Sequence, residues 1–265
     1  MEQLTAQART EGMTFLSNVA AEDVEQPFDL TFMLENPDFD NDATAGWTST
    51  NGAPGYDAKG AEFYERTFDF YQVLDMMPSG IYEWCAYAFQ RPGSADNIYA
   101  QYTANKSKVT TSLYIGNADS PVCHICDDRQ ATALFNDGSW GSDRQMGDGT
   151  YIPNCMTGAE RYFDKGLYDN SVATEVTTSG ESLRLGIRCT NAPTYYWTMF
   201  DHFRLYFYGG NKTIVHIEDI LQTSEAECGD GCIYDLSGRR IANSKQDLPL
   251  KKGLYIQNGK KVLIR

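Results

Sequence analysis

The chain has 265 residues, of which 42% are hydrophobic and 13% aromatic, and a formal net charge of −14 at pH 7. A chain of this size can bury a core without disulfides or metals. The negative charge argues against nucleic-acid binding and against an anionic membrane surface, because both need Lys and Arg. The sequence also contains no run of 18 apolar residues, so it predicts no transmembrane segment.

The N-terminal segment, residues 1–25, predicts a short helix. Its apolar residues have a weak helical period among polar neighbours. It lacks the basic start and the continuous apolar run of a signal peptide, so we expect no signal peptide in this sequence.

Residues 26–210 predict an antiparallel β-sandwich, because their apolar residues recur with the period of two that half-buried strands have. Aromatic and β-branched residues are frequent here, and Gly, Asn and Asp suit the turns. Pro78 and Gly80 predict a turn between two of the strands. The expected strands fall within residues 28–39, 61–74, 81–91, 109–117, 122–126, 171–178, 181–190 and 197–209.

Two long loops interrupt these strands. They span about residues 91–108 and 130–165, and the second contains GAERYF, 158–163, which predicts a short helix. The fold class is therefore all-β, with little helix.

Residues 211–265 predict a linker and a small β subdomain. Asn258-Gly259 lies between two apolar runs, Gly253–Ile256 and Lys260–Arg265, which is a strong hairpin signal. Residues 239–265 hold eight Lys and Arg residues and one acidic residue, whereas the rest of the chain carries about −21. Such asymmetry indicates that the tail and the body have different roles.

The tail resembles a known family. Its elements YDLSGR, GLYI and the closing GKKVLIR occur in order within residues 232–265. They resemble the C-terminal sorting domain of the type IX secretion system of Gram-negative bacteria. The resemblance implies a secreted or cell-surface protein whose C-terminal unit is recognised by secretion machinery. The alternative is a small β subdomain that only caps the body.

The body also resembles a family. The stretches NPDFDNDATAGWTST (36–50), FDFYQVLDMMPSGIYEWCAYAFQR (68–91) and WTMFDHFRLYFYG (197–209) occur in this order. They resemble landmarks of carbohydrate-binding modules with the galactose-binding-like jelly roll. The resemblance implies this fold and a glycan as partner, although the fold also occurs in modules that bind no sugar.

A sugar site needs exposed aromatic rings beside a few fixed polar groups, because rings stack on the C–H faces of sugars and polar groups bind hydroxyls. We expect such a site on the loops. Its candidate ligand-binding residues are Arg91, Trp140, Asp143, Arg144, Tyr195 and Tyr196. Ordinary loop packing is the alternative for each aromatic ring. The other three tryptophans, Trp47, Trp84 and Trp197, are expected in the core.

The jelly-roll resemblance also implies a structural Ca²⁺ between the first loop and the last strand. Asp40 and Asp201 stand at the corresponding positions. Ca²⁺ prefers carboxylate and carbonyl oxygens, so these two residues are the predicted ligands. Asp40 is one methylene shorter than the Glu of the family, and Asp38 and Asp42 could either compensate for this or be ordinary solvated turn residues.

The seven cysteines include two close pairs, Cys123/Cys126 and Cys228/Cys232. The pairs could form a zinc site, two local disulfides or unpaired thiols, and Cys85 is expected in the core. No serine-hydrolase elbow, His-Glu-x-x-His motif or phosphate-binding loop occurs. We therefore predict a non-catalytic module that binds carbohydrate through loop aromatics. The alternative is a structural or protein-adhesion module without a sugar site.

Overall fold

The computed structural model describes residues 27–39, 45–57 and 60–209, together with the backbone of four short strands beyond residue 232. The predicted helix in residues 1–25 and the predicted ligand Asp40 lie outside the described residues. By its contacts the chain divides into two compact units, Met1–Lys212 and Thr213–Arg265.

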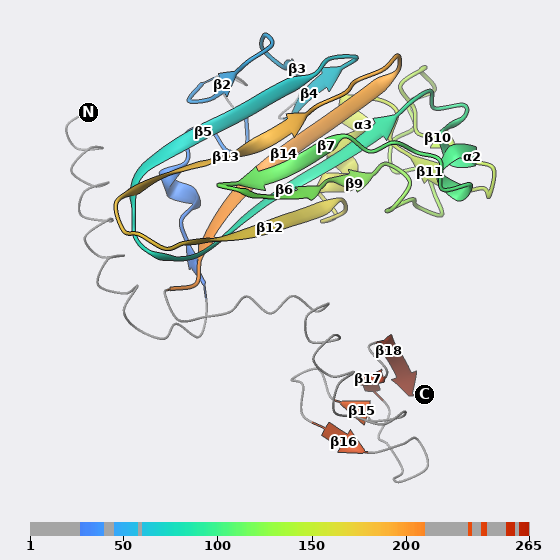
Figure 1. Cartoon of the computed structure of the whole chain (residues 1–265). Helices are drawn as coiled ribbons and strands as arrows, with labels where there is room; N and C mark the ends of the chain where they lie inside the picture. Colours follow the sequence, from blue (N-terminus) through green and yellow to red (C-terminus); the bar gives the residue numbers. More distant parts are fainter. Residues whose placement is uncertain are drawn as a thin grey trace. The chain divides into compact units, whose positions relative to one another are not determined.

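The first unit is built from two β-sheets, and the predicted antiparallel β-sandwich is confirmed (Figure 1). We call the larger sheet A. It has the order β12-β6-β14-β4-β3, with β1 paired to β14 and β9 paired in parallel to β6. Its strands are β1 (Phe28–Asp29), β3 (Gly55–Asp57), β4 (Gly60–Tyr64), β6 (Gly80–Pro92), β9 (Cys123–His124), β12 (Asp169–Val176) and β14 (Tyr196–Phe207).

The smaller sheet, sheet B, has the order β2-β5-β13-β7-β8, and all its neighbouring strands are antiparallel. Its strands are β2 (Thr48–Ser49), β5 (Phe68–Met77), β7 (Thr111–Ile115), β8 (Ala118–Pro121) and β13 (Glu181–Cys189). The turn predicted around Pro78 joins β5 to β6, and Gly80 there has φ +145°, which a residue with a side chain rarely adopts.

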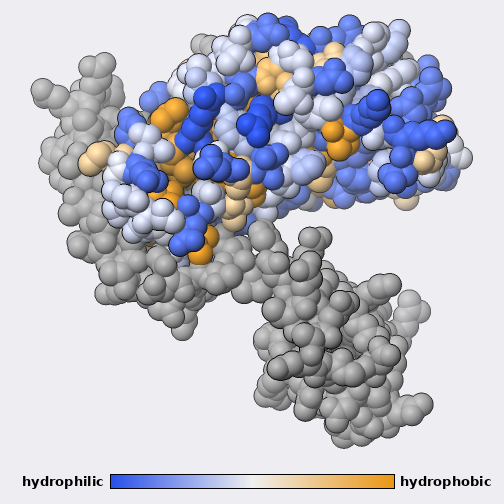
Figure 2. Space-filling model, in the orientation of Figure 1, coloured by the Kyte–Doolittle hydropathy of each residue, from blue (hydrophilic) through white to orange (hydrophobic). Residues whose placement is uncertain are grey.

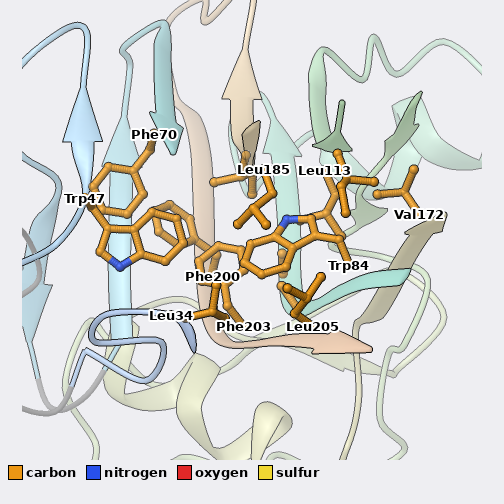
Figure 3. Packing of buried hydrophobic residues seen from close by; sticks show 14 of the residues in the cluster. Leu34, Trp47, Phe70, Trp84, Leu113, Val172, Leu185, Phe200, Phe203 and Leu205 are labelled. Carbon is orange, nitrogen blue, oxygen red and sulfur yellow. The ribbon is translucent and has the colours of Figure 1, made fainter. Parts of the chain in front are cut away.

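The main core lies between the two sheets and is rich in stacked aromatic rings. The Trp47 ring stacks on Phe70 with centroids 4.7 Å apart, and Trp84 stacks on Phe203 at 4.8 Å. The Trp84 indole N–H donates to the carbonyl of Gly186 at 3.2 Å, so its only polar atom is satisfied. Both tryptophans are buried as predicted. Figure 3 shows these packed rings with aliphatic neighbours such as Leu113, Val172 and Leu185.

The long alternating run at residues 61–74 is not one strand, which corrects the prediction. Its first part forms β4 in sheet A and its second part forms β5 in sheet B. Between them Glu65 has φ +50°, which turns the chain into the other sheet. Phe63 faces the core before this turn and Phe68 and Phe70 face it afterwards, so the inward set changes from odd to even numbers.

The strand predicted within residues 28–39 is also mostly wrong. Only β1 pairs, and the chain then forms the 3-10 turn η1 (Thr31–Met33). Asn36 and Phe39 both have positive φ, which interrupts an extended backbone. Leu30, Met33 and Phe39 are nevertheless buried, so the apolar pattern reports burial without a strand.

The two long loops fold over the outer face of sheet A. We call residues 93–108 and 125–168 the cover segments. They contain α2 (Ile98–Thr103), β10 (Arg144–Gln145), β11 (Tyr151–Ile152) and α3 (Met156–Phe163). The predicted short helix corresponds to α3, which contacts β4 and β14, whereas α2 was not predicted. Figure 1 shows α2, β10 and β11 together at one end of the sandwich.

The cover segments and sheet A enclose a second core. Phe89 and Met199 point outward from sheet A and are fully buried beneath residues such as Tyr162, Phe163 and Tyr168. Outward positions of a strand become apolar when another layer covers them. No helix among the described residues is long and apolar enough to cross a membrane.

The second unit contains a four-stranded antiparallel sheet of order β16-β15-β17-β18. Its strands are β15 (Ile233–Tyr234), β16 (Arg240–Ala242), β17 (Gly253–Gln257) and β18 (Lys260–Ile264). The predicted hairpin is confirmed, because Gln257 and Lys260 are partners at the end of the β17–β18 ladder.

Candidate functional site

A rim of polar and aromatic side chains lies where the cover segments end on sheet A. Arg91 of β6 and Tyr64 of β4 are both register partners of Trp197 in β14, so the three residues form one row across the sheet. The Arg91 guanidinium carbon lies 5.1 Å from the centroid of the Trp197 ring, which is a cation–π distance. Arg91 is only 8% exposed, whereas Tyr64 is 43% exposed.

Two further predicted residues join this row. Tyr195, 52% exposed, precedes β14 with φ +65°, and its backbone N–H donates to Glu65 Oε1 at 2.6 Å. Because Glu65 follows Tyr64 directly in the chain, this bond brings Tyr64 and Tyr195 near each other. Arg144 of β10 forms an ion pair with Asp96 and lies close enough to Arg91 to lower its pKa. We call Arg91, Arg144, Tyr64 and Tyr195 the rim site.

The electrostatics of the rim site are dominated by the burial of Arg91. Desolvation lowers the pKa of this guanidinium, while the nearby Tyr64 and Glu62 oppose the effect. Burial also raises the pKa of Tyr64, with a further contribution from the Glu65 carboxylate. Both groups keep their ordinary protonation at neutral pH, so the site presents a cation beside neutral phenols.

Trp140 is the most exposed of the large hydrophobic side chains in the described residues, at 85%. Its loop is held by local hydrogen bonds, including Ser139 N–H to Asp137 Oδ1 at 2.9 Å. The Asn154 side-chain amide donates to the Trp140 carbonyl at 2.7 Å. The ring is thus displayed by an anchored loop, and the alternative of ordinary loop packing is wrong.

Two predicted ligand residues instead hold the structure together. The Asp143 carboxylate accepts the backbone N–H groups of Leu134 and Phe135, at 2.7 and 3.0 Å, and lies 3.1 Å from the Tyr162 hydroxyl. Tyr196 is 1% exposed, and its hydroxyl binds Gln90 and Thr110 inside the sandwich. Tyr196 is therefore part of the core, which corrects its assignment as a ligand residue, whereas Asp143 Oδ1 is buried without a hydrogen-bond partner.

The outer face of sheet B carries a second polar and aromatic cluster that the sequence reasoning missed. The Arg184 guanidinium carbon lies 3.5 Å from the Tyr71 ring centroid, and its Nη2 lies 2.6 Å from Asp69. The Tyr114 hydroxyl donates to the same carboxylate at 2.6 Å. The alternation in β13, with Arg184, Gly186 and Arg188 outward, is the signal that could have found this cluster.

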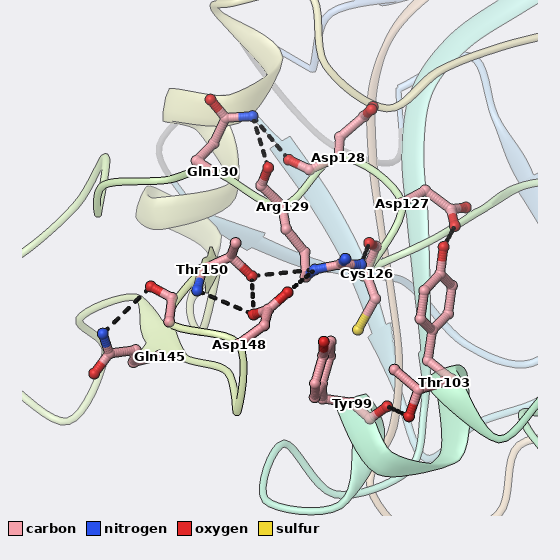
Figure 4. Close-up of polar contacts among 12 residues, drawn as sticks. Tyr99, Thr103, Cys126, Asp127, Asp128, Arg129, Gln130, Gln145, Asp148 and Thr150 are labelled. Atoms are coloured by element: carbon pink, nitrogen blue, oxygen red, sulfur yellow. Dashed lines mark hydrogen bonds and ion pairs between the residues drawn. The ribbon is translucent and has the colours of Figure 1, made fainter.

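The network around Arg129 is structural (Figure 4). The Arg129 guanidinium lies 5.3 Å from the rings of both Tyr99 and Tyr102, and its Nε donates to Thr150 Oγ1 at 3.1 Å. Asp148 completes the contact at 3.5 Å. The network joins α2 to the residues just before β11 within the cover segments.

His124 and the described cysteines offer no catalytic arrangement. His124 Nδ1 accepts the Cys126 backbone N–H at 3.0 Å, so Nε2 carries the proton and faces Ser107 Oγ at 3.1 Å. Burial lowers the His124 pKa to about 4. Cys123 and Cys126 are free thiols, so no disulfide joins this pair. Cys228 and Cys232 lie outside the described residues, and Cys85 is buried as predicted.

Asp201 is a fully buried carboxylate. Its Oδ1 has no hydrogen-bond partner, and its Oδ2 lies 2.6 Å from His202 Nδ1, an ion-pair distance that raises the pKa of His202. Desolvation raises the Asp201 pKa to about 6. A protonated His202 is the partner that the described residues supply for this buried charge. Within the described residues no group of three or more His, Cys, Asp or Glu side chains forms a metal site.

Comparison with solved structures gives two matches. No family model matches the chain, and no curated protein matches it. The chain is similar to TmCBM61, solved in complex with β-1,4-galactotriose, at 12% identity over 66% of this chain and 97% of that chain, with a TM-score of 0.29. It is also similar to the CBM22-1 xylan-binding domain of Paenibacillus barcinonensis Xyn10C, at 15% identity over 65% and 92%, with a TM-score of 0.30.

Proposed function

We propose that this chain is a non-catalytic module that binds carbohydrate at the rim site. The observation that carries the proposal is the pair of half-exposed rings, Tyr64 and Tyr195, beside the buried guanidinium of Arg91. Tyrosine rings can stack on the C–H faces of a sugar, and a fixed guanidinium can donate to its hydroxyls. Trp140 supplies a further exposed ring on the cover segment that carries Arg144.

The test is binding of the whole chain to a glycan array, followed by titration calorimetry with the best ligand. We expect a dissociation constant between about 1 mM and 1 µM, the affinity that a shallow site with few contacts supplies. Tyr195→Ala should weaken binding by about tenfold or more, because it removes a stacking ring worth roughly 1–2 kcal/mol.

Phe32→Ala is the matched control. Phe32 is 70% exposed, like the rings of the rim site, but it lies near the opposite end of β14. The backbone N–H of Leu30, two residues before Phe32, donates to the carbonyl of Leu205 at that end. The control should leave the affinity unchanged. Absence of binding to every glycan class would remove the proposal and favour the structural or protein-adhesion module.

We also propose a structural Ca²⁺ with Asp201 as ligand and Asp40 as the expected second carboxylate. The Oδ1 atom of Asp201, which is buried without a hydrogen-bond partner, supports this proposal. Excess chelator should lower the melting temperature of the wild-type protein and leave that of Asp201→Asn unchanged. Equal melting curves with and without chelator would refute it.

We further propose that the C-terminal unit directs export and that the protein acts outside the cell. The ordered motifs and the basic charge of residues 239–265 support this proposal. Residues 211–265 fused to a reporter should deliver it to the medium or the cell surface of a bacterium that has type IX secretion. A reporter that stays inside the cell, while a known sorting domain exports it, would contradict the proposal.

A further inference from the structure

The rim site contains a buried positive charge without a matching acid. Arg91 is 8% exposed, and its Nε is buried without a hydrogen-bond partner. Within the described residues no carboxylate forms an ion pair with it. A guanidinium does not lose its proton at accessible pH, so its burial costs free energy until an anion compensates the charge.

The neighbouring carboxylates are already committed. Glu62 Oε2 accepts the Trp197 indole N–H at 2.6 Å, so this oxygen is already engaged. Asp96 is paired with Arg144, and Glu65 accepts the backbone N–H of Tyr195. The three acids lower the positive electrostatic potential around Arg91. None of them offers Arg91 two parallel acceptor oxygens, which is the arrangement that a guanidinium group prefers.

The surroundings of Arg91 favour a ligand with both a negative group and a ring. Arg144, whose side chain is 47% exposed, brings a second guanidinium near Arg91. Tyr64 and Tyr195 place half-exposed rings beside the same point. A sugar that carries a carboxylate joins these two features in one residue.

We infer that the rim site selects sugars bearing a carboxylate, the uronic acids, through Arg91. This inference rests on the proposed carbohydrate function and names its substrate class. A carboxylate is planar and accepts two parallel N–H bonds from a guanidinium, which a hydroxyl cannot do. The chain has a net charge of −14 and repels polyanions at long range, so the selection is a contact effect within the site.

The experiment compares trigalacturonic acid with its methyl ester by titration calorimetry on the full chain. The two probes share the same sugar backbone and differ at the carboxyl groups, where the ester has a methyl group in place of the negative charge. Wild-type protein should bind the acid about tenfold or more tightly than the ester, as charge-assisted hydrogen bonds predict. Arg91→Met, which keeps the packing volume, should bring the ratio of the two affinities close to one.

Arg91→Lys and Arg188→Gln complete the set of variants. Arg91→Lys keeps the positive charge but loses the two parallel N–H donors of the guanidinium group, so it should retain only part of the preference for the acid over the ester. This variant still tests the inference if Arg91→Met fails to fold. Arg188 of sheet B lies 3.5 Å from Asp119, and Arg188→Gln should leave the ratio unchanged. Melting curves establish that each variant is folded.

The outcomes separate the inference from the function on which it rests. Equal binding of acid and ester, or binding of neutral glycans alone, overturns the carboxylate selection and leaves the carbohydrate function standing. A preference for the acid that survives in Arg91→Met but is lost in Arg188→Gln also overturns it, because the acid then binds on sheet B. Failure to bind any glycan class removes both.

Discussion

In both sheets the side chains alternate between the core and the outer face, but the outward side chains of the two sheets differ in polarity. On sheet A, the outward residues Phe89 and Met199 are apolar, because the cover segments bury them. On sheet B, the outward residues Asp69 and Arg184 are charged and face solvent beside Tyr71. The hydrophilic residues that dominate the visible surface in Figure 2 fit this picture. Outward positions therefore record whether a second layer lies above them, and the rim site forms where that layer stops.

The largest effect should come from removing a ring beneath the cover. Phe89→Ala should lower the free energy of unfolding by about 3–5 kcal/mol, because it leaves a cavity between sheet A and the cover segments. Denaturant unfolding measures this change. Val73→Ala, at a 48% exposed outward position of sheet B, should cost less than about 1 kcal/mol. Similar costs for both variants would break the comparison.

The next largest effect should come from lowering the pH, which tests whether His124 is buried in its neutral form. His124 has a folded pKa of about 4 against 6.5 when exposed, so the unfolded chain binds the extra proton between these values. Stability is thus complete above pH 6.5 and falls as the pH drops toward 4, by up to about 3 kcal/mol.

His124→Asn isolates this contribution, because Asn can still accept the Cys126 N–H. Its unfolding free energy should fall less than that of the wild-type protein between pH 7 and pH 4.5. Parallel pH profiles for the two proteins would show that His124 is not buried in its neutral form.

A glycine in the centre of the open face gives a smaller effect. A Cβ atom at Gly186 would lie 2.3 Å from the Phe70 carbonyl oxygen in the neighbouring strand, so the backbone must shift. We expect Gly186→Ala to cost about 1–3 kcal/mol. Ser182→Ala, outward on the same strand, serves as the control and should change stability by less than about 1 kcal/mol. A neutral Gly186→Ala would mean that the two strands approach less closely than described.

The smallest effect belongs to Trp140. With 85% of its side chain exposed, Trp140→Ala should change the unfolding free energy by less than about 0.5 kcal/mol. The loss of ligand binding would then be separable from stability. A destabilisation above about 1 kcal/mol would show that the ring packs against the protein.

Much of the sandwich could be predicted from the sequence, because each long strand carries its own alternation. The break at Glu65 could not, since the residue types continue the pattern while one positive φ redirects the chain. The 3-10 turn after β1 was not predicted for a similar reason: its apolar residues are buried although they do not form a strand.

The site was predicted in part. The display of Trp140 was predictable from its Gly, Ser and Asp neighbours, which offer no apolar stripe to join. Tyr64 was missed, because its place beside Arg91 depends on the register of both strands with Trp197, far along the chain. Adjacent Tyr195 and Tyr196 were treated alike, although one precedes the strand with positive φ and the other enters the core.

The free thiols of the sandwich also make it a convenient subject for chemical labelling. Burial raises the pKa values of Cys85, Cys123 and Cys126 to about 12. Because thiolates react with alkylating reagents and thiols scarcely do, these three side chains stay inert in the native protein at neutral pH. Unfolding returns them to ordinary reactivity, so the rate at which iodoacetamide adds mass to them reads out directly how often the sandwich opens.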